Sequence, residues 1–193
     1  ERPTALGPQN NNENLAMNHP GPTTIDSHSL PFVISSLHIA SDDLPFAEDF
    51  GAPGVRLKLL SADVEGAMFA VRIRFAPGVQ LPPHHHTGAV HAFTLSGEWS
   101  YLEHADTPPS RAGSYLFEPP GSSHTLKVAD HNHGETDVLF IIYGAMLIQD
   151  EAGNIVAKLD AGSHLHDWPA ALRAQGSAVP SIIEGGHVHY SRP

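Results

Sequence analysis

The 193-residue chain contains no cysteine, which excludes disulfide-stabilised folds and every metal site built on thiolates. Basic residues are also scarce, with 10 Lys and Arg against 21 Asp and Glu and a formal net charge of −11. A surface that binds nucleic acid or an anionic membrane needs the opposite balance of charge. We therefore expect neither nucleic acid nor a membrane among its partners.

Long apolar runs are missing too. The longest, Val138–Ile148, contains Gly144 and is shorter than the roughly 17–25 residues of a membrane-spanning helix, so it predicts one buried strand. The first 30 residues lack the apolar core of a secretion signal. The expectation is a soluble, acidic, cytoplasmic protein.

Residues 1–31 are rich in Asn, Pro and Gly and show little apolar periodicity. Such a segment buries too little apolar surface to offset the entropy of ordering it, which predicts a flexible N-terminal tail or an extended arm. A β-domain is expected at 32–168. A short helix and a C-terminal tail are expected at 169–193, because Pro169–Gln175 has a proline at its start and is followed by Gly176.

Within the expected domain, short runs of β-branched, aromatic or alternating residues are separated by glycine and proline. The runs are Val55–Leu60, Ala67–Phe75, Ala89–Leu95, Glu98–His104, Ser114–Glu118, His124–Val128 and Val138–Ile148. Many short strands at this spacing are typical of an all-β sandwich or barrel.

Histidine is the residue that the chain has in abundance, with 15 copies. His84 and His86 are two positions apart, so on a strand their imidazoles project from one face while His85 points the other way. His124 follows a turn at Pro119–Gly121 that can hold a third imidazole in a fixed place. Three neutral imidazoles can cap a divalent ion and leave positions open for water, substrate or oxygen.

Glycines and prolines frame these histidines at regular spacings. The two patterns are Gly78-x5-His84-x-His86-x4-His91-x5-Gly97 and Gly113-x5-Pro119-x-Gly121-x2-His124-x3-Val128. They resemble the two sequence motifs of the cupin family. The resemblance implies an all-β fold with a single cupin domain, the double-stranded β-helix or small jelly-roll barrel. Isomerases, oxygenases and storage proteins share that fold, so it does not define a function.

The first motif departs from the cupin pattern at one position. Cupins usually carry Glu three or four residues beyond the histidine pair, but this chain has Val90 and His91 there. Strand alternation alone does not decide which of the two faces the metal site. We therefore predict a site of three histidines, with His91 either as a fourth ligand or as a group beside the ligands.

A closer resemblance covers roughly residues 40–160. The segments HTGAVHAFTLSGEWSYLEH, AGSYLFEPPGSSHTL and TDVLFIIYGAML are similar to the 2,4'-dihydroxyacetophenone dioxygenase family. That resemblance implies non-haem Fe(II) held by His84, His86 and His124, with Zn, Ni or Mn as other metals that the purified protein can carry. It also implies cleavage of a carbon–carbon bond in a small α-hydroxyketone or diketone by O2. Cupins are frequently dimers, and by that analogy we expect a homo-oligomer.

Glu118 lies six residues before His124, at the end of an expected strand. It can orient a ligand imidazole or act as the base for a substrate proton, which makes it the predicted catalytic residue together with His91. The alternative is a solvated carboxylate at the sheet edge, in which case Tyr115 and Phe117 face the pocket instead.

Other polar residues are expected outside the site. Glu98 is expected in a turn, and Arg72 and Arg74 at the surface or at a dimer contact. Histidines that lack the glycine and proline frame are expected at the surface: His131, His133, His164, His166, His187 and His189.

Two other functions are compatible with a metal-binding cupin. One is a non-catalytic protein in which the metal stabilises the barrel or senses a ligand. The other is a metal-dependent sugar isomerase, for which we would expect a carboxylate ligand and more Lys or Arg around the pocket.

Overall fold

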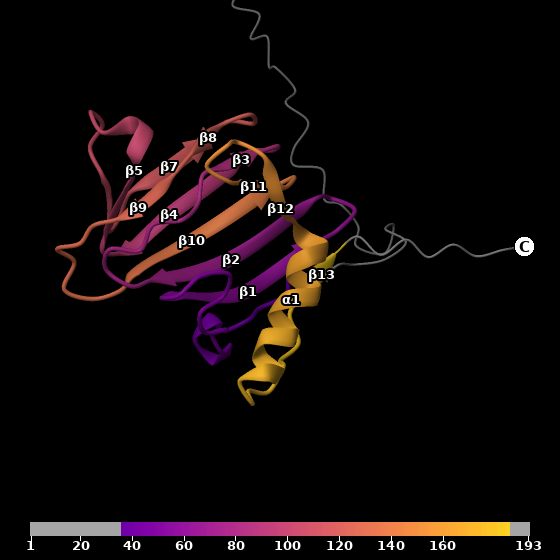
Figure 1. Cartoon of the computed structure of the whole chain (residues 1–193). Coiled ribbons are helices and arrows are strands. Elements are labelled where there is room, and N and C mark those ends of the chain that lie inside the picture. Colours follow the sequence, from indigo (N-terminus) through magenta and orange to yellow (C-terminus); the bar gives the residue numbers. More distant parts are fainter. Residues whose placement is uncertain (1–35, 186–193) are drawn as a thin grey trace, which may run out of the picture. The chain divides into compact units, whose positions relative to one another are not determined.

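A computed structural model describes residues 36–185 (Figure 1). A compact unit begins at Leu37. The expected N-terminal arm, 1–31, and the histidines at 187 and 189 lie outside the described residues. Among the helices of residues 36–185, none is long and apolar enough to cross a membrane.

The largest sheet has six strands in the order β13-β1-β2-β10-β4-β7. Its strands are β1 (Val55–Asp63), β2 (Met68–Phe75), β4 (Val90–Ser96), β7 (Tyr115–Glu118), β10 (Thr136–Tyr143) and β13 (Ile183–Gly185). All neighbours are antiparallel except β1 and β13. Strands distant in sequence therefore lie side by side, as β10 does between β2 and β4 (Figure 1).

Two smaller sheets complete the barrel. The first has the order β12-β11-β3-β8, with β3 (His84–His86), β8 (Ser123–His124), β11 (Met146–Gln149) and β12 (Ile155–Leu159). The second has the order β6-β5-β9, with β5 (Glu98–Tyr101), β6 (Ser110–Arg111) and β9 (Leu126–Val128). Short 3-10 turns occupy Ser41–Asp43 and Leu102–His104. The prediction of an all-β jelly-roll barrel is confirmed.

The six-stranded sheet has one apolar face and one partly charged face. On β2, Val71 and Phe75 are fully buried in the core, while Arg72 and Arg74 alternate with them. Both guanidinium groups bind Asp137 of β10, with nitrogen–oxygen distances of 2.8 Å. Both arginine side chains are partly exposed, at 17% and 30%, so the surface expected for them is confirmed in part, and a dimer contact stays a prediction.

The apolar run Val138–Ile148 forms two strands rather than the single strand predicted. Gly144 has φ of +71°, a conformation that side chains disfavour, and it separates β10 from β11. The chain thereby passes from the six-stranded sheet to the sheet that contains β3. This turn is what places β11 beside the histidine pair of β3.

The C-terminal helix, α1, spans Ala161–Ala174 and is longer than predicted. Asp160 and Ser163 cap its start reciprocally: the Asp160 side chain accepts from the Ser163 amide at 2.9 Å, and the Ser163 hydroxyl accepts from the Asp160 amide at 2.8 Å. Pro169 lies inside the helix rather than at its start. The domain boundary drawn at residue 168 therefore cuts the helix and is wrong.

One face of α1 is buried against the sheet. Trp168 is 1% exposed and its indole N–H donates to the Leu57 carbonyl at 3.0 Å. His164 is also buried and stacks on Phe69, with 4.3 Å between ring centroids. The prediction that His164 lies at the surface is therefore wrong. His131, His133 and His166 are exposed, as predicted.

Candidate metal centre

The pairing of β3 with β8 brings three histidines together inside the barrel. His84 lies opposite His124 in this antiparallel pair, and His86 projects from the same face of β3. The three side chains are 3–4% exposed, and their candidate ligand atoms all lie within 4.8 Å of one another. His85 points away from the cluster and contacts the Ser123 hydroxyl at 2.8 Å.

The nitrogen atoms of this cluster fit a divalent metal ion. His84 Nδ1 lies 2.9 Å from the Pro82 carbonyl, which only accepts, so Nδ1 carries the hydrogen and Nε2 keeps its lone pair. His86 Nδ1 and His124 Nε2 are buried and form no well-aligned hydrogen bond, although His124 Nε2 lies 3.2 Å from an oxygen of Glu118. Buried nitrogens are rarely left unpaired unless something binds them. Three such donors match the set that a catalytic metal takes.

The protonation of the cluster is suited to the same task. Burial lowers the pKa of His84, and the nearby His124 adds to the effect. Burial also lowers the pKa of His86 to about 4. Both imidazoles are therefore neutral near pH 7, the form in which histidine coordinates a metal.

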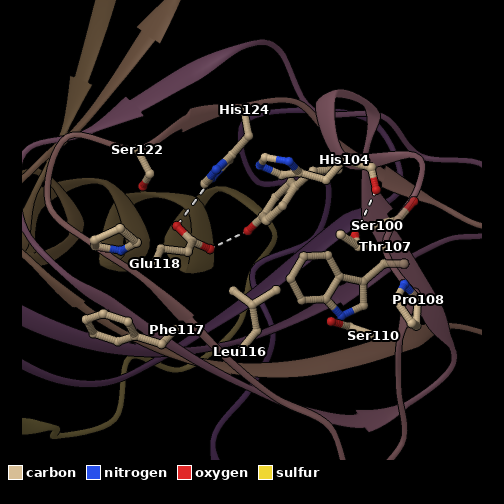
Figure 2. A pocket seen from close by; sticks show the side chains of 13 residues that line it. Ser100, His104, Thr107, Pro108, Ser110, Leu116, Phe117, Glu118, Ser122 and His124 are labelled. Atoms are coloured by element: carbon tan, nitrogen blue, oxygen red, sulfur yellow. Dashed lines mark hydrogen bonds and ion pairs between the residues drawn. The ribbon is translucent and has the colours of Figure 1, made fainter.

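Glu118 lies at the cluster, on β7, and is 4% exposed. One carboxylate oxygen is 3.2 Å from Nε2 of His86. The same oxygen is 3.2 Å from Nε2 of His124, and a dashed line marks this contact in Figure 2. Burial alone would raise the pKa of Glu118, but the imidazoles of His124 and His86 outweigh that effect and lower it. The carboxylate is thus ionised beside the histidines, while Tyr115 and Phe117 are more than half exposed.

Tyr101 is a site residue that the sequence did not predict. Its hydroxyl donates to the second oxygen of Glu118, and its ring stacks on His124 with 3.8 Å between centroids. Burial and the charge of Glu118 raise the pKa of Tyr101 well above its usual range, so the phenol stays protonated. The signal that could have found it is that a buried tyrosine hydroxyl needs a hydrogen-bond partner.

His91 does not lie at the cluster. Its Nδ1 is 2.8 Å from the Tyr115 hydroxyl, and its ring contacts Phe117 and Tyr143, which are exposed residues. The neighbouring Val90 is the buried residue of the pair and lies opposite Glu118. The predicted role of His91 as a ligand or catalytic group is therefore wrong, because alternation along β4 turns it outward.

A pocket of about 280 Å³ opens beside Glu118 and His124 (Figure 2). Its other lining residues are Trp99, Ser100, Tyr101, His104, Thr107, Pro108, Ser110, Leu116, Phe117, Pro119 and Ser122. Within residues 36–185, the lining contains no lysine or arginine, and Glu118 is its only carboxylate. Glu98 lies elsewhere and accepts from Arg111 at 2.7 Å. The pocket is therefore suited to a neutral molecule with an apolar ring and a few hydrogen-bonding groups.

Comparison with known proteins identifies the family. Residues 35–146 match the model of the ChrR cupin-like domain. The chain belongs to this cupin family. The resemblance to cupins predicted from the two histidine motifs is thereby confirmed.

Several solved structures are similar to this cupin. A cupin-like protein of unknown function from Ralstonia eutropha JMP134 is 31% identical and has a TM-score of 0.75, covering 84% of this chain and 100% of that one. An RmlC-like cupin from the same organism is 24% identical with a TM-score of 0.70, covering 78% and 95%.

An acetylacetone dioxygenase from Acinetobacter johnsonii is 19% identical with a TM-score of 0.59, covering 72% of this cupin and 94% of that chain. At this identity the similarity shows the fold alone. No curated protein matches the chain.

Proposed function

We propose that this cupin is a metal-dependent dioxygenase that cleaves a carbon–carbon bond in a neutral aromatic α-hydroxyketone or a diketone. The observation that carries the proposal is the ionised Glu118, which lies beside a buried three-histidine cluster and is the only carboxylate that the described residues contribute to the pocket. Two similarities support it: the sequence resembles the dihydroxyacetophenone dioxygenases, and the fold is that of an acetylacetone dioxygenase.

His84, His86 and His124 would hold the divalent metal, which we propose is Fe(II). When bound, that ion supplies positive charge that acidifies a ketone or hydroxyl ligand, and it supplies the electrons that activate oxygen. Because histidine coordinates as the neutral imidazole, the three ligands leave the charge of the ion undiminished, and Glu118 is the negative charge beside them. This favours a substrate that becomes an anion, as an α-hydroxyketone or β-diketone does on losing one proton.

Glu118 is the base in this proposal. Its oxygen beside His86 and His124 accepts the proton from the carbon next to the ketone, and Tyr101 holds the other oxygen in place. The substrate ring packs in the pocket against the apolar side chains of Trp99 and Leu116. These contacts orient the substrate and exclude water from the reacting carbon.

The overall reaction needs no other reductant. An α-hydroxyketone and O2 contain together the atoms of one carboxylic acid and one formic acid, so both oxygen atoms enter the products. A sugar isomerase is disfavoured, since none of the described residues that line the pocket is a lysine or arginine that could bind a phosphate or a sugar acid.

Oxygen consumption tests this proposal. Metal-free protein is loaded with Fe(II) under nitrogen and given aromatic α-hydroxyketones and β-diketones in an oxygen electrode. We expect at least one compound to be consumed together with one equivalent of O2, and His124→Ala to be inactive while His85→Ala is active. An iron-loaded, folded protein that is inert toward the whole panel would favour the non-catalytic alternative.

A further inference from the structure

A second, smaller pocket lies among the side chains of the barrel interior, next to the histidine cluster. Its volume is about 50 Å³. Eight apolar residues line it: Ile73, Phe75, Leu81, Val90, Leu126, Phe140, Ile142 and Met146. The polar residues that reach it are His84, His86, Tyr101 and Glu118. We call this space the inner pocket, and the space of about 280 Å³ beside Glu118 and His124 the outer pocket.

The two pockets differ in the size of molecule that they accept. An apolar cavity of about 150 Å³ holds one benzene ring, and ligand pockets for organic molecules begin near about 300 Å³. The volume of the outer pocket is close to the value for organic molecules, whereas the inner pocket is too small for a benzene ring. A cavity admits one water from about 10–15 Å³, so the inner pocket has room for a molecule of about two or three heavy atoms.

The inner pocket is also a poor place for water. A buried water needs about two to four hydrogen-bonding partners. The Tyr101 hydroxyl is already bound to Glu118, and His84 Nδ1 to the Pro82 carbonyl. His86 Nδ1 is also a proposed metal donor, so with the metal bound one oxygen of Glu118 is the polar atom left for a water. The rest of the wall consists of eight apolar side chains, which favours a small apolar molecule over water.

We propose that the inner pocket is a binding site for dioxygen, an inference that rests on the proposed dioxygenase function. Tyr101 and Glu118 line both pockets. A molecule in the outer pocket would therefore lie next to a molecule in the inner pocket, beside the histidine cluster. The organic substrate then enters the outer pocket and oxygen occupies the inner one. The two substrates bind in separate spaces and do not compete.

Xenon binding tests the site without any reaction, because xenon is a small apolar atom that occupies cavities of this kind. Crystals of the metal-free and the Fe(II)-loaded protein are pressurised with xenon and their diffraction is measured. The expected result is a xenon atom between Val90, Leu126 and Phe140. Ordered water in this space, with xenon absent or bound only elsewhere, would overturn the proposal.

Val90→Ile fills the inner pocket with one methyl group, and Val71→Ile is the matched control. Both valines are buried in strands of the same sheet, but Val71 does not line the pocket. We expect Val90→Ile to lose the xenon atom and Val71→Ile to keep it. Phe140→Leu, which enlarges the pocket, should raise the xenon occupancy and provides a second variant should Val90→Ile not fold.

Steady-state kinetics then links the pocket to oxygen. Val90→Ile should raise the KM for O2 roughly tenfold, the lower end of the effect of one methylene group in an apolar pocket, with the KM for the organic substrate unchanged. An unchanged KM for O2 in a variant that has lost xenon would overturn the assignment to dioxygen. Xenon in the inner pocket of a protein that is inert toward every ketone would refute both the dioxygen assignment and the proposed function. An active protein that binds no xenon in the inner pocket would refute the dioxygen site but not the proposed dioxygenase function.

Discussion

Tyr101 donates a hydrogen bond to one oxygen of Glu118, while the other oxygen lies 3.2 Å from the imidazoles of His86 and His124. The two residues come from β5 and β7, which belong to different sheets. The hydroxyl of Tyr101, which stays protonated, thus holds the carboxylate against two histidines of the cluster. This arrangement fixes which oxygen of Glu118 is free to act on a substrate.

The first prediction concerns the metal ligands. His124→Ala should lose most of the bound metal, because two nitrogens remain where three are needed. His85→Ala should retain the metal, since its ring contacts Ser123 on the opposite face of β3. Metal content per chain after a chelator wash checks both variants. Equal metal loss in the two variants would mean that the cluster is not the site.

Glu118→Gln keeps the shape of the side chain and removes its charge and basicity. We expect the metal to be retained and turnover to fall by roughly 10²-fold or more, as for the loss of a general base. Glu98→Gln is the control, because Glu98 binds Arg111 away from the cluster. Wild-type turnover of Glu118→Gln over the whole pH range would show that Glu118 is not the base.

Tyr101→Phe removes a hydrogen bond that lowers the pKa of Glu118. The pKa of Glu118 should rise, so activity should be lost at a higher pH as the solution is acidified. Turnover near pH 7 should fall by about 10- to 100-fold because the carboxylate is no longer held in place. A pH–rate profile checks the shift. Tyr115→Phe, which alters only the contact with His91, should leave the profile unchanged.

The triad was predictable from sequence because it depends on local spacing. His84 and His86 are two residues apart, so on a strand they project from the same face. The turn before His124 is marked by proline and glycine. The inward face of β4 was not predictable, since Val90 and His91 both alternate with apolar neighbours. Only the pairing of Val90 with Glu118 across the sheet decides it.

Other features depend on contacts between distant parts of the chain. The role of Tyr101 follows from its meeting with Glu118 across two sheets. The start of α1 was missed because Asp160 and Ser163 form a cap in which serine replaces the usual Glu or Gln. The pockets are lined by side chains from many strands, so no local sequence pattern predicts them.

Asp137 links the stability of the barrel to pH. Burial alone would raise its pKa, but the hydrogen bonds from Arg72 and Arg74 outweigh that effect and lower it. A lowered pKa in the folded state adds stability above about pH 4, and this is lost as the pH falls through the folded-state pKa. Asp137→Asn should therefore lower the free energy of unfolding at pH 7 by about 2–3 kcal/mol.

Urea denaturation at several pH values checks this prediction. The difference between wild type and Asp137→Asn should shrink below about pH 4, where the carboxyl is protonated first in the unfolded state and, at lower pH, in the folded protein. Asp42→Asn is the control, because Asp42 binds the same Arg72 but is 85% exposed, and exposed pairs contribute little. A difference that stays constant with pH would show that Asp137 does not stabilise the barrel through its charge.

The fate of the two oxygen atoms tests the proposed dioxygenase function most directly. Fe(II)-loaded protein is supplied with ¹⁸O2 and the α-hydroxyketone that it consumes, and the products are analysed by mass spectrometry. The proposed function predicts one labelled oxygen in the carboxylic acid and one in formate. Cleavage products without label, or oxygen uptake without cleavage, would contradict it.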